Sequence, residues 1–254
     1  MKKKAIVTGG SRGIGFAIAQ KLKSLNYDVV IWHNDTFPTP GGKEFKEVIV
    51  DLQHTQSAAI YAVKETEKLW KKNFILDVLV NNAGVCQAKS FRDISLTEYD
   101  EIMDINLKAP FFITQTLLPW MRKNKSPNMV SNVINISSIS GLQGFTGHSH
   151  YCASKFGLIG LTQVLAKELV GEGIAANAIC PGPTHTDMWA KLDKEYEDMN
   201  DWLSDKPESE RYYGKLMIKR LGEPEDIARA VEYILAGNYS TGMAMTVCGG
   251  NLLR

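Results

Sequence analysis

The sequence predicts an α/β fold: one domain with a doubly wound, mostly parallel seven-stranded sheet and helices on both faces. Seven short, β-branched apolar runs alternate with longer helical patterns along the chain, which is typical of βαβ units. The apolar residues within a run are mostly continuous, as expected of strands that are buried on both faces. The 254 residues contain no internal repeat or linker, so we expect residues 1–254 to form a single domain.

The strands are predicted at the seven apolar runs, taken here in chain order. They are "KAIVTGG", "DVVIW", "EVIVDL", "LDVLVNNAG", "NVINISS", "IAANAICPG" and "MAMTVCGG". Helical patterns lie between them, at 13–25, 55–71, 98–123, 151–171 and 224–236. "SLTE" at 95–98 fits a capping box, and Pro224 suits the first turn of the last helix.

Two segments depart from this alternation. The stretch "HNDTFPTPGGKEFK" between the second and third runs is rich in proline and glycine, so we expect a loop in place of a full crossover helix. Residues 187–213 are acidic, contain several aromatic residues and follow the sixth run. They fit either a solvated helical pair or a lid over a site at the carboxyl ends of the strands.

The overall composition excludes several classes of protein. A formal net charge of +1 gives no electrostatic case for nucleic acid or a membrane surface. No apolar run approaches the length of a membrane span, and the apolar stretch after "MKKK" is too short for a signal peptide. Cys86, Cys152, Cys180 and Cys248 show no metal-ligand spacing, so we expect no metal site and reduced cysteines in a cytoplasmic protein.

The motif "TGGSRGIG" at 8–15 directly follows the first predicted strand and opens a helix. Its glycines allow a tight turn, close approach of the backbone to a pyrophosphate, and packing of the helix on the strand. The helix N-terminus adds amide donors for phosphates. Taken alone, the motif also fits an ordinary glycine-rich turn. The candidate cofactor contacts in it are Gly9, Ser11, Arg12, Gly13, Ile14 and Gly15.

A second motif, "SHYCASK" at 149–155, places Tyr151 and Lys155 one helical turn apart on the same face. An ammonium near a phenol favours the phenolate and lowers its pKa. Such a tyrosine could transfer protons near neutral pH. Pairs with this spacing also occur by chance on solvated helices.

These two motifs belong to a longer series. "TGGSRGIG", "NNAG" at 81–84, "NISS" at 135–138, "YCASK" at 151–155 and "PGPTHTDM" at 181–188 occur in the order seen in the short-chain dehydrogenase/reductase family. The sequence resembles the branch that includes the 3-oxoacyl carrier-protein reductases. The resemblance implies a Rossmann fold and an NAD(P)(H)-dependent oxidoreductase that interconverts a ketone and a secondary alcohol.

The resemblance also implies a catalytic tetrad of Asn106, Ser138, Tyr151 and Lys155. Tyr151 would act as general acid in reduction and as base in oxidation. Lys155 would lower the pKa of Tyr151 and hydrogen-bond the nicotinamide ribose. Ser138 would donate a hydrogen bond to the reacting oxygen. Asn106 would hold a water that links Lys155 to solvent.

Further contacts follow from the same resemblance. Besides the glycine motif, the expected cofactor contacts are Asp51, Leu52, Asn82, Ala83, Gly84, Tyr151, Lys155, Pro181, Gly182, Thr184 and Thr186. The expected walls of the substrate pocket are Ser138, Gln143, Phe145, His148 and Met188.

The choice between the two cofactors depends on the residues near the ribose 2′ position. His33 stands where NAD-preferring relatives carry aspartate, and Asn34 where many NADP-preferring relatives carry arginine. Arg12 adds a cation beside this pocket, while Asp35 is nearby but one or two positions late. We therefore expect NADP(H) to be favoured over NAD(H).

The substrate is expected to be a free ketone or secondary alcohol of modest size. The segment from Asp187 to Glu210 contains nine Asp or Glu residues and three Lys residues. This acidic balance disfavours anionic carrier-bound substrates. The alternatives are an NAD-dependent dihydrodiol or cyclic alcohol dehydrogenase, suggested by the shortened second crossover, and a catalytically idle dinucleotide-binding sensor. The resemblance further implies a homo-oligomer, a tetramer or dimer, although Cys248 replaces the usual aspartate near the last strand.

Overall fold

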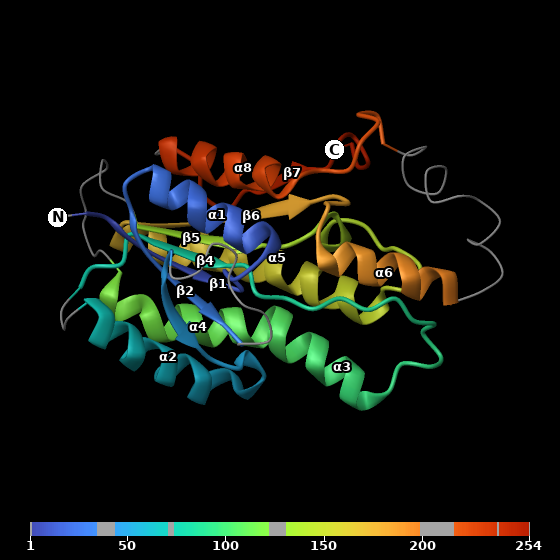
Figure 1. Cartoon of the computed structure of the whole chain (residues 1–254), viewed down its shortest axis with the longest axis horizontal. Coiled ribbons are helices and arrows are strands. Elements are labelled where there is room, and N and C mark those ends of the chain that lie inside the picture. Colours follow the sequence, from blue (N-terminus) through green and yellow to red (C-terminus); the bar gives the residue numbers. More distant parts are fainter. Residues whose placement is uncertain are drawn as a thin grey trace.

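The computed structural model contains one seven-stranded sheet covered by helices on both faces (Figure 1). It describes residues 2–34, 44–70, 74–121, 131–198, 216–237 and 239–253, without the side chains of 197 and 198. The strand order is β3-β2-β1-β4-β5-β6-β7, and each neighbouring pair is parallel. The predicted doubly wound α/β fold is therefore confirmed.

Each described strand overlaps one of the seven predicted runs, and three of them extend one residue beyond it, at His33, Lys46 and Ser131. The strands are β1 (Lys4–Thr8), β2 (Asp28–His33), β3 (Lys46–Ile49), β4 (Val78–Asn81), β5 (Ser131–Ile136), β6 (Ile174–Pro181) and β7 (Ala244–Val247). The chain winds outward from β1 in one direction and from β4 in the other. In such sheets the crevice for ligands lies at the carboxyl ends of the strands, at this switch point.

The described helices match the predicted periodic segments, with one difference. They are α1 (Gly13–Ser24), α2 (Thr55–Trp70), α3 (Leu96–Met103), α4 (Ala109–Leu117), α5 (Ser149–Leu169), α6 (Asp187–Asp198) and α8 (Pro224–Ala236). The capping box of Ser95 and Glu98 is confirmed, and Pro224 occupies the first turn of α8.

The difference concerns the helical pattern at 98–123, which forms several pieces. A π-helical turn, Asp104–Lys108, separates α3 from α4, and a short 3-10 turn, Leu118–Trp120, follows α4. Pro110 has no N–H to donate to the carbonyl of Asn106 four residues earlier, and this favours a local change of helical register. The change places Asn106 in the π-helical turn, at the carboxyl end of the sheet.

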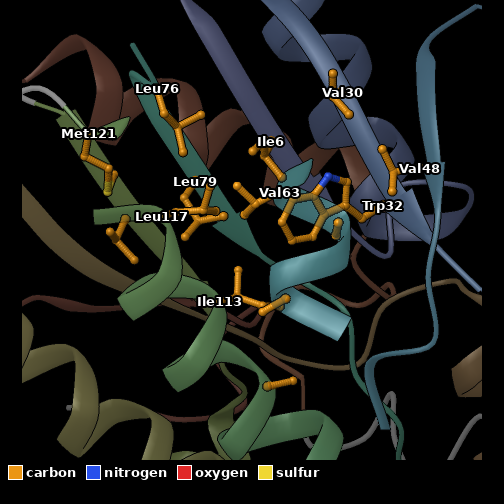
Figure 2. Close-up of a cluster of buried hydrophobic side chains, with 14 of the residues drawn as sticks. Ile6, Val30, Trp32, Val48, Val63, Leu76, Leu79, Ile113, Leu117 and Met121 are labelled. Atoms are coloured by element: carbon orange, nitrogen blue, oxygen red, sulfur yellow. The ribbon is translucent and has the colours of Figure 1, made fainter. Parts of the chain in front are cut away.

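The core consists of two layers, one on each face of the sheet. On the face of α2, α4 and α5, Ile6, Trp32 and Leu79 of the strands lie with Val63 of α2 and Ile113 of α4 (Figure 2). The strand residues between them point to the other face, toward α1 and α8. Burial on both faces explains why the strands read as continuous apolar runs.

Two expectations fall partly outside the described residues. The loop expected between β2 and β3 includes residues 35–43, and the expected lid at 187–213 includes residues 199–213; neither range is described. The first part of this segment is α6, which lies beside the N-terminal part of α5 (Figure 1). Among the described helices, none has the length and apolarity needed to cross a membrane.

Candidate active site

A cavity of about 940 Å³ lies at the carboxyl ends of the strands, where the sheet order reverses. The predicted cofactor and substrate residues all line it, with one member of the tetrad, Asn106, lying behind the wall. Additional lining residues that the sequence did not single out include Val50, Val85, Cys86, Ser140, Thr146, Trp189, Leu192, Tyr196 and Asn251. The predicted site residues thus come together around one space, which makes them a coherent candidate site.

The glycine-rich turn packs closely against the residues that follow β4. Gly9 and Gly13 have φ values of +62° and +52°, in the left-handed region that favours glycine. A Cβ on Gly15 would lie 2.1 Å from the carbonyl oxygen of Gly9 and 2.4 Å from Nδ2 of Asn82. The Asn82 amide donates to the carbonyls of Thr8 and Gly9, at 2.9 and 3.1 Å. Glycine at position 15 is therefore required for the two loops to meet.

The N-terminus of α1 suits an anionic group. Arg12 precedes the helix in an extended conformation and does not cap it with its side chain, while residues 13–15 line the cavity. A Cβ on Gly13 would lie 3.3 Å from Cγ2 of Thr186, so the glycine keeps the space between α1 and the loop after β6 open. Backbone N–H groups and the helix dipole at this position fit the diphosphate of a dinucleotide.

Tyr151 and Lys155 are buried side by side on α5. The Lys155 Nζ lies 5.6 Å from the centroid of the Tyr151 ring and donates to the carbonyl of Ile136 at 3.0 Å. Burial lowers the pKa of Lys155 to about 8. Burial raises the pKa of Tyr151, and its hydrogen bond with Ser138 opposes this only in part.

Burial of the phenol therefore opposes the lowering of the Tyr151 pKa that is expected of Lys155, and that role of Lys155 stays a prediction. The tyrosine keeps its proton at neutral pH. A protonated phenol is the form that a general acid needs.

Ser138 is positioned by the turn after β5. Its Oγ accepts a hydrogen bond from the backbone N–H of Ser140 at 3.1 Å, which leaves its own O–H to donate. The neighbouring Ser137 donates to the backbone carbonyl of Lys155 at 3.0 Å, so the end of β5 and α5 are held together. Ser138 and Tyr151, which are thirteen residues apart in the sequence, are therefore brought together in the fold.

Asn106 is fully buried, and its side chain is occupied by protein groups. Its Oδ1 accepts from the N–H of Val85 at 2.9 Å, and its Nδ2 donates to the Val85 carbonyl at 2.8 Å and to Ser154 Oγ at 3.2 Å. A Cβ on Gly84 would lie 3.2 Å from this Oδ1 and 3.5 Å from Lys155 Nζ. The side chain therefore ties the loop after β4 to α5, and the expected water relay stays a prediction.

Both basic side chains near the presumed ribose 2′ position face carboxylates. Arg12 Nη1 lies 2.9 Å from Asp187 Oδ2 at the start of α6, and both side chains are exposed. Nε2 of the buried His33 lies 3.6 Å from Glu47 Oε2. Sequence reasoning missed both carboxylates, since each comes from another element. Asp35, the acid that the sequence places nearby, lies outside the described residues.

Sequence reasoning also missed the inner face of α6. Trp189, Leu192 and Tyr196 pack in one cluster with Tyr151 and Cys86. Their spacing of three and four residues is a helical-face pattern, which the sequence contains and which predicts one buried side. One side of α6 therefore packs on the site through these three side chains, and the interpretation of residues 187–213 as a lid stays a prediction.

Two polar contacts fasten α6 to the rest of the site. The carboxylate of Glu195 accepts from the backbone N–H of Ala88 at 2.8 Å. The Tyr196 hydroxyl lies 3.0 Å from Nε2 of His148, in the loop before α5. The substrate end of the cavity is therefore built jointly by α6 and the loop after β5.

Comparison with known proteins agrees with this site. The family model described as short chain dehydrogenase matches residues 3–197. The 3-oxoacyl-[acyl-carrier-protein] reductase of Staphylococcus epidermidis is 35% identical over 98% of this chain and 99% of its own length. The corresponding reductase of Aquifex aeolicus is 32% identical over 98% of this chain and 96% of its own length.

Solved structures give the same result. The ligand-free aldohexose dehydrogenase of Thermoplasma acidophilum superimposes with a TM-score of 0.84 at 26% identity, over 98% of this chain and 94% of that one. A 3-ketoacyl-(acyl-carrier-protein) reductase of Brucella melitensis complexed with NADH gives a TM-score of 0.84 at 23% identity, over 98% of each chain, and shows the shared fold. The chain belongs to the short-chain dehydrogenase family and is an oxidoreductase that acts on CH–OH groups with a nicotinamide cofactor.

Proposed function

We propose that the protein interconverts a free ketone and a secondary alcohol with NADP(H), and that Tyr151 is the general acid and base. One observation carries this proposal: Tyr151, Ser138 and Lys155 lie together in the lining of one cavity. When bound, the cofactor supplies the hydride that reaches the carbonyl carbon. The turn at residues 9–15 would hold its diphosphate and Lys155 its ribose.

The proton chemistry belongs to the protein. In reduction, Tyr151 transfers its phenolic proton to the carbonyl oxygen as that oxygen gains charge. Ser138 donates a hydrogen bond to the same oxygen and stabilises the developing negative charge. The ammonium of Lys155, beside the ring, stabilises the phenolate that remains. In oxidation, the phenolate takes the proton back.

A free substrate is proposed in preference to a carrier-bound one. The curated relatives act on substrates attached to acyl carrier protein, as their names state. Of the described residues that line this cavity, only Arg12 and Lys155 are lysine or arginine, and Arg12 is paired with Asp187. The start of α6 at the cavity mouth is acidic, which disfavours an anionic carrier.

One observation supports a second candidate, an NAD-dependent alcohol dehydrogenase. Glu47 beside His33 places a carboxylate near the presumed ribose 2′ position, where an acidic group favours the hydroxyl of NAD. A similar structure, at 26% identity, is named an aldohexose dehydrogenase.

The cofactor preference is tested by Arg12→Gln. We expect the Kd for NADPH to rise about tenfold, because a charge-assisted hydrogen bond to the 2′-phosphate is lost, while the Kd for NADH stays unchanged. Titration by calorimetry measures both constants. Arg92→Gln, an exposed arginine outside the cavity lining, is the matched control. A wild-type protein that binds NADH more tightly than NADPH would refute the preference and favour the second candidate.

We also propose a homo-oligomer located in the cytoplasm. Phe111 on α4 and Phe156 and Val164 on α5 have 45%, 47% and 48% of their surface exposed, which favours burial against a second copy. The four cysteines are free, as expected in a reducing compartment.

A further inference from the structure

We propose that the substrate is an uncharged molecule with a hydroxyl next to the reacting carbon, a hydroxy ketone or polyol, and that His148 and Tyr196 recognise this hydroxyl. The inference rests on the proposed function and names the substrate class of the same site. Neither residue is needed for the proton transfer that Tyr151 performs.

The position of the pair fits a second recognition point beside the reacting group. His148 lies in the loop before α5, and its ring centroid is 5.6 Å from that of Tyr151 and 5.3 Å from that of Tyr196. Both His148 and Tyr196 line the cavity, although only 7% and 8% of their surfaces are exposed. A substrate whose carbonyl oxygen lies at Tyr151 could therefore place a neighbouring hydroxyl within reach of His148 and Tyr196.

The chemistry of the pair selects a neutral group. Burial lowers the pKa of His148 to about 4, and His150 contributes in the same direction, so the imidazole is neutral at pH 7. A neutral imidazole has one donor and one acceptor nitrogen, and a phenol has one proton and acceptor lone pairs. The bond of 3.0 Å from Tyr196 engages Nε2 of His148, while Nδ1 lies farther from the same hydroxyl, at 3.5 Å, so Nδ1 is the ring nitrogen that a substrate hydroxyl can engage.

The surroundings of the pair disfavour charge. Trp189, Leu192 and Cys86 form the apolar wall next to it, and burial raises the pKa of the Cys86 thiol, which is therefore neutral. Further polar lining comes from neutral side chains: Ser140, Gln143 and Thr146. A carboxylate or phosphate at this pair would lose its hydration against neutral and apolar side chains, at a high cost in free energy.

A purely mechanical role for the same contact makes a different prediction. If the bond between Tyr196 and His148 only fastens α6 over the cavity, its loss weakens turnover of all substrates equally. If the pair recognises a hydroxyl, its loss weakens only the substrates that carry one. Matched substrates separate the two roles.

The test compares kcat/KM for 2-hydroxycyclohexanone, cyclohexanone and 4-oxocyclohexanecarboxylate with NADPH. For the wild type we expect the hydroxy ketone to exceed cyclohexanone by about tenfold or more, because a site built for a hydroxyl discriminates against its absence. We expect Tyr196→Phe to remove most of this advantage, so that kcat/KM falls by a larger factor for the hydroxy ketone than for cyclohexanone. Tyr233→Phe, at an exposed position on α8, is the matched control and should change neither value.

Other outcomes overturn the inference. Equal losses on both ketones in Tyr196→Phe would show a fastening role, and highest activity on the carboxylate would show a charged substrate class. Failure of the proposed function looks different, since no ketone would then be reduced by the NADPH-bound protein. In that case calorimetric titration of the NADP⁺ complex with trans-1,2-cyclohexanediol still tests recognition: binding that Tyr196→Phe weakens supports it, and no binding contradicts it.

Discussion

Replacing Tyr151 with phenylalanine is expected to lower kcat by about 10²–10⁴-fold, the usual contribution of a general acid. The aromatic ring and its packing against Cys86 and Leu192 remain, but the proton donor is lost. NADPH binding should change much less than kcat, because the proposed diphosphate contacts on the turn at residues 9–15 remain. Steady-state reduction of a ketone and calorimetric titration with NADPH measure the two effects.

The control for this change is Tyr61→Phe, which removes the hydroxyl from a tyrosine that is half exposed on α2. It should leave both kcat and NADPH binding unchanged. Retention of more than about a tenth of the wild-type kcat by the Tyr151 variant would contradict the role of this residue as general acid.

Replacing Gly15 with alanine is expected to have the largest effect on stability and cofactor binding. The added Cβ would overlap the Gly9 carbonyl oxygen and the Asn82 amide, both of which hold the phosphate-binding turn. Overpacking of this kind costs about 1–3 kcal/mol of the free energy of unfolding. In a chain of this size, each kcal/mol lowers Tm by roughly 2–4 °C. Displacement of the turn should also weaken NADPH binding by at least about tenfold, which is about 1.4 kcal/mol.

Gly171→Ala is the matched control, because a Cβ at that position meets no atom within 4 Å. It should leave both the Tm and the NADPH affinity at the wild-type values. Normal Tm and NADPH affinity in the Gly15 variant would show that the turn and Asn82 are not packed as described. Thermal unfolding followed by circular dichroism gives the Tm of both variants.

The sheet could be predicted from the sequence because the apolar pattern of each strand matches its burial in the fold. Runs such as 4–8 and 174–181 are continuous and apolar, and both faces of the sheet are covered. The interruption of the helix predicted at 98–123 was not apparent from periodicity. It depends on Pro110 and on the bonds of Asn106 to Val85, a residue that is distant in sequence.

The same distinction applies to the site. The glycine turn and the pair Tyr151–Lys155 are local motifs, so the sequence contains them in full. The contact of Tyr196 with His148 and that of Arg12 with Asp187 join distant segments, so spacing could not reveal them. The direction of the pKa shift of Tyr151 depends on how deeply the folded chain buries the phenol, and a helical spacing of four carries no such information.

The most direct test of the account is a single-turnover experiment on the wild-type protein with bound NADPH. Addition of 2-hydroxycyclohexanone should abolish the absorbance of the reduced nicotinamide, with uptake of one proton for each cofactor oxidised, as proton donation and hydride transfer together require. No binding of NADPH or NADH, or bound cofactor that stays reduced with every ketone offered, would contradict it.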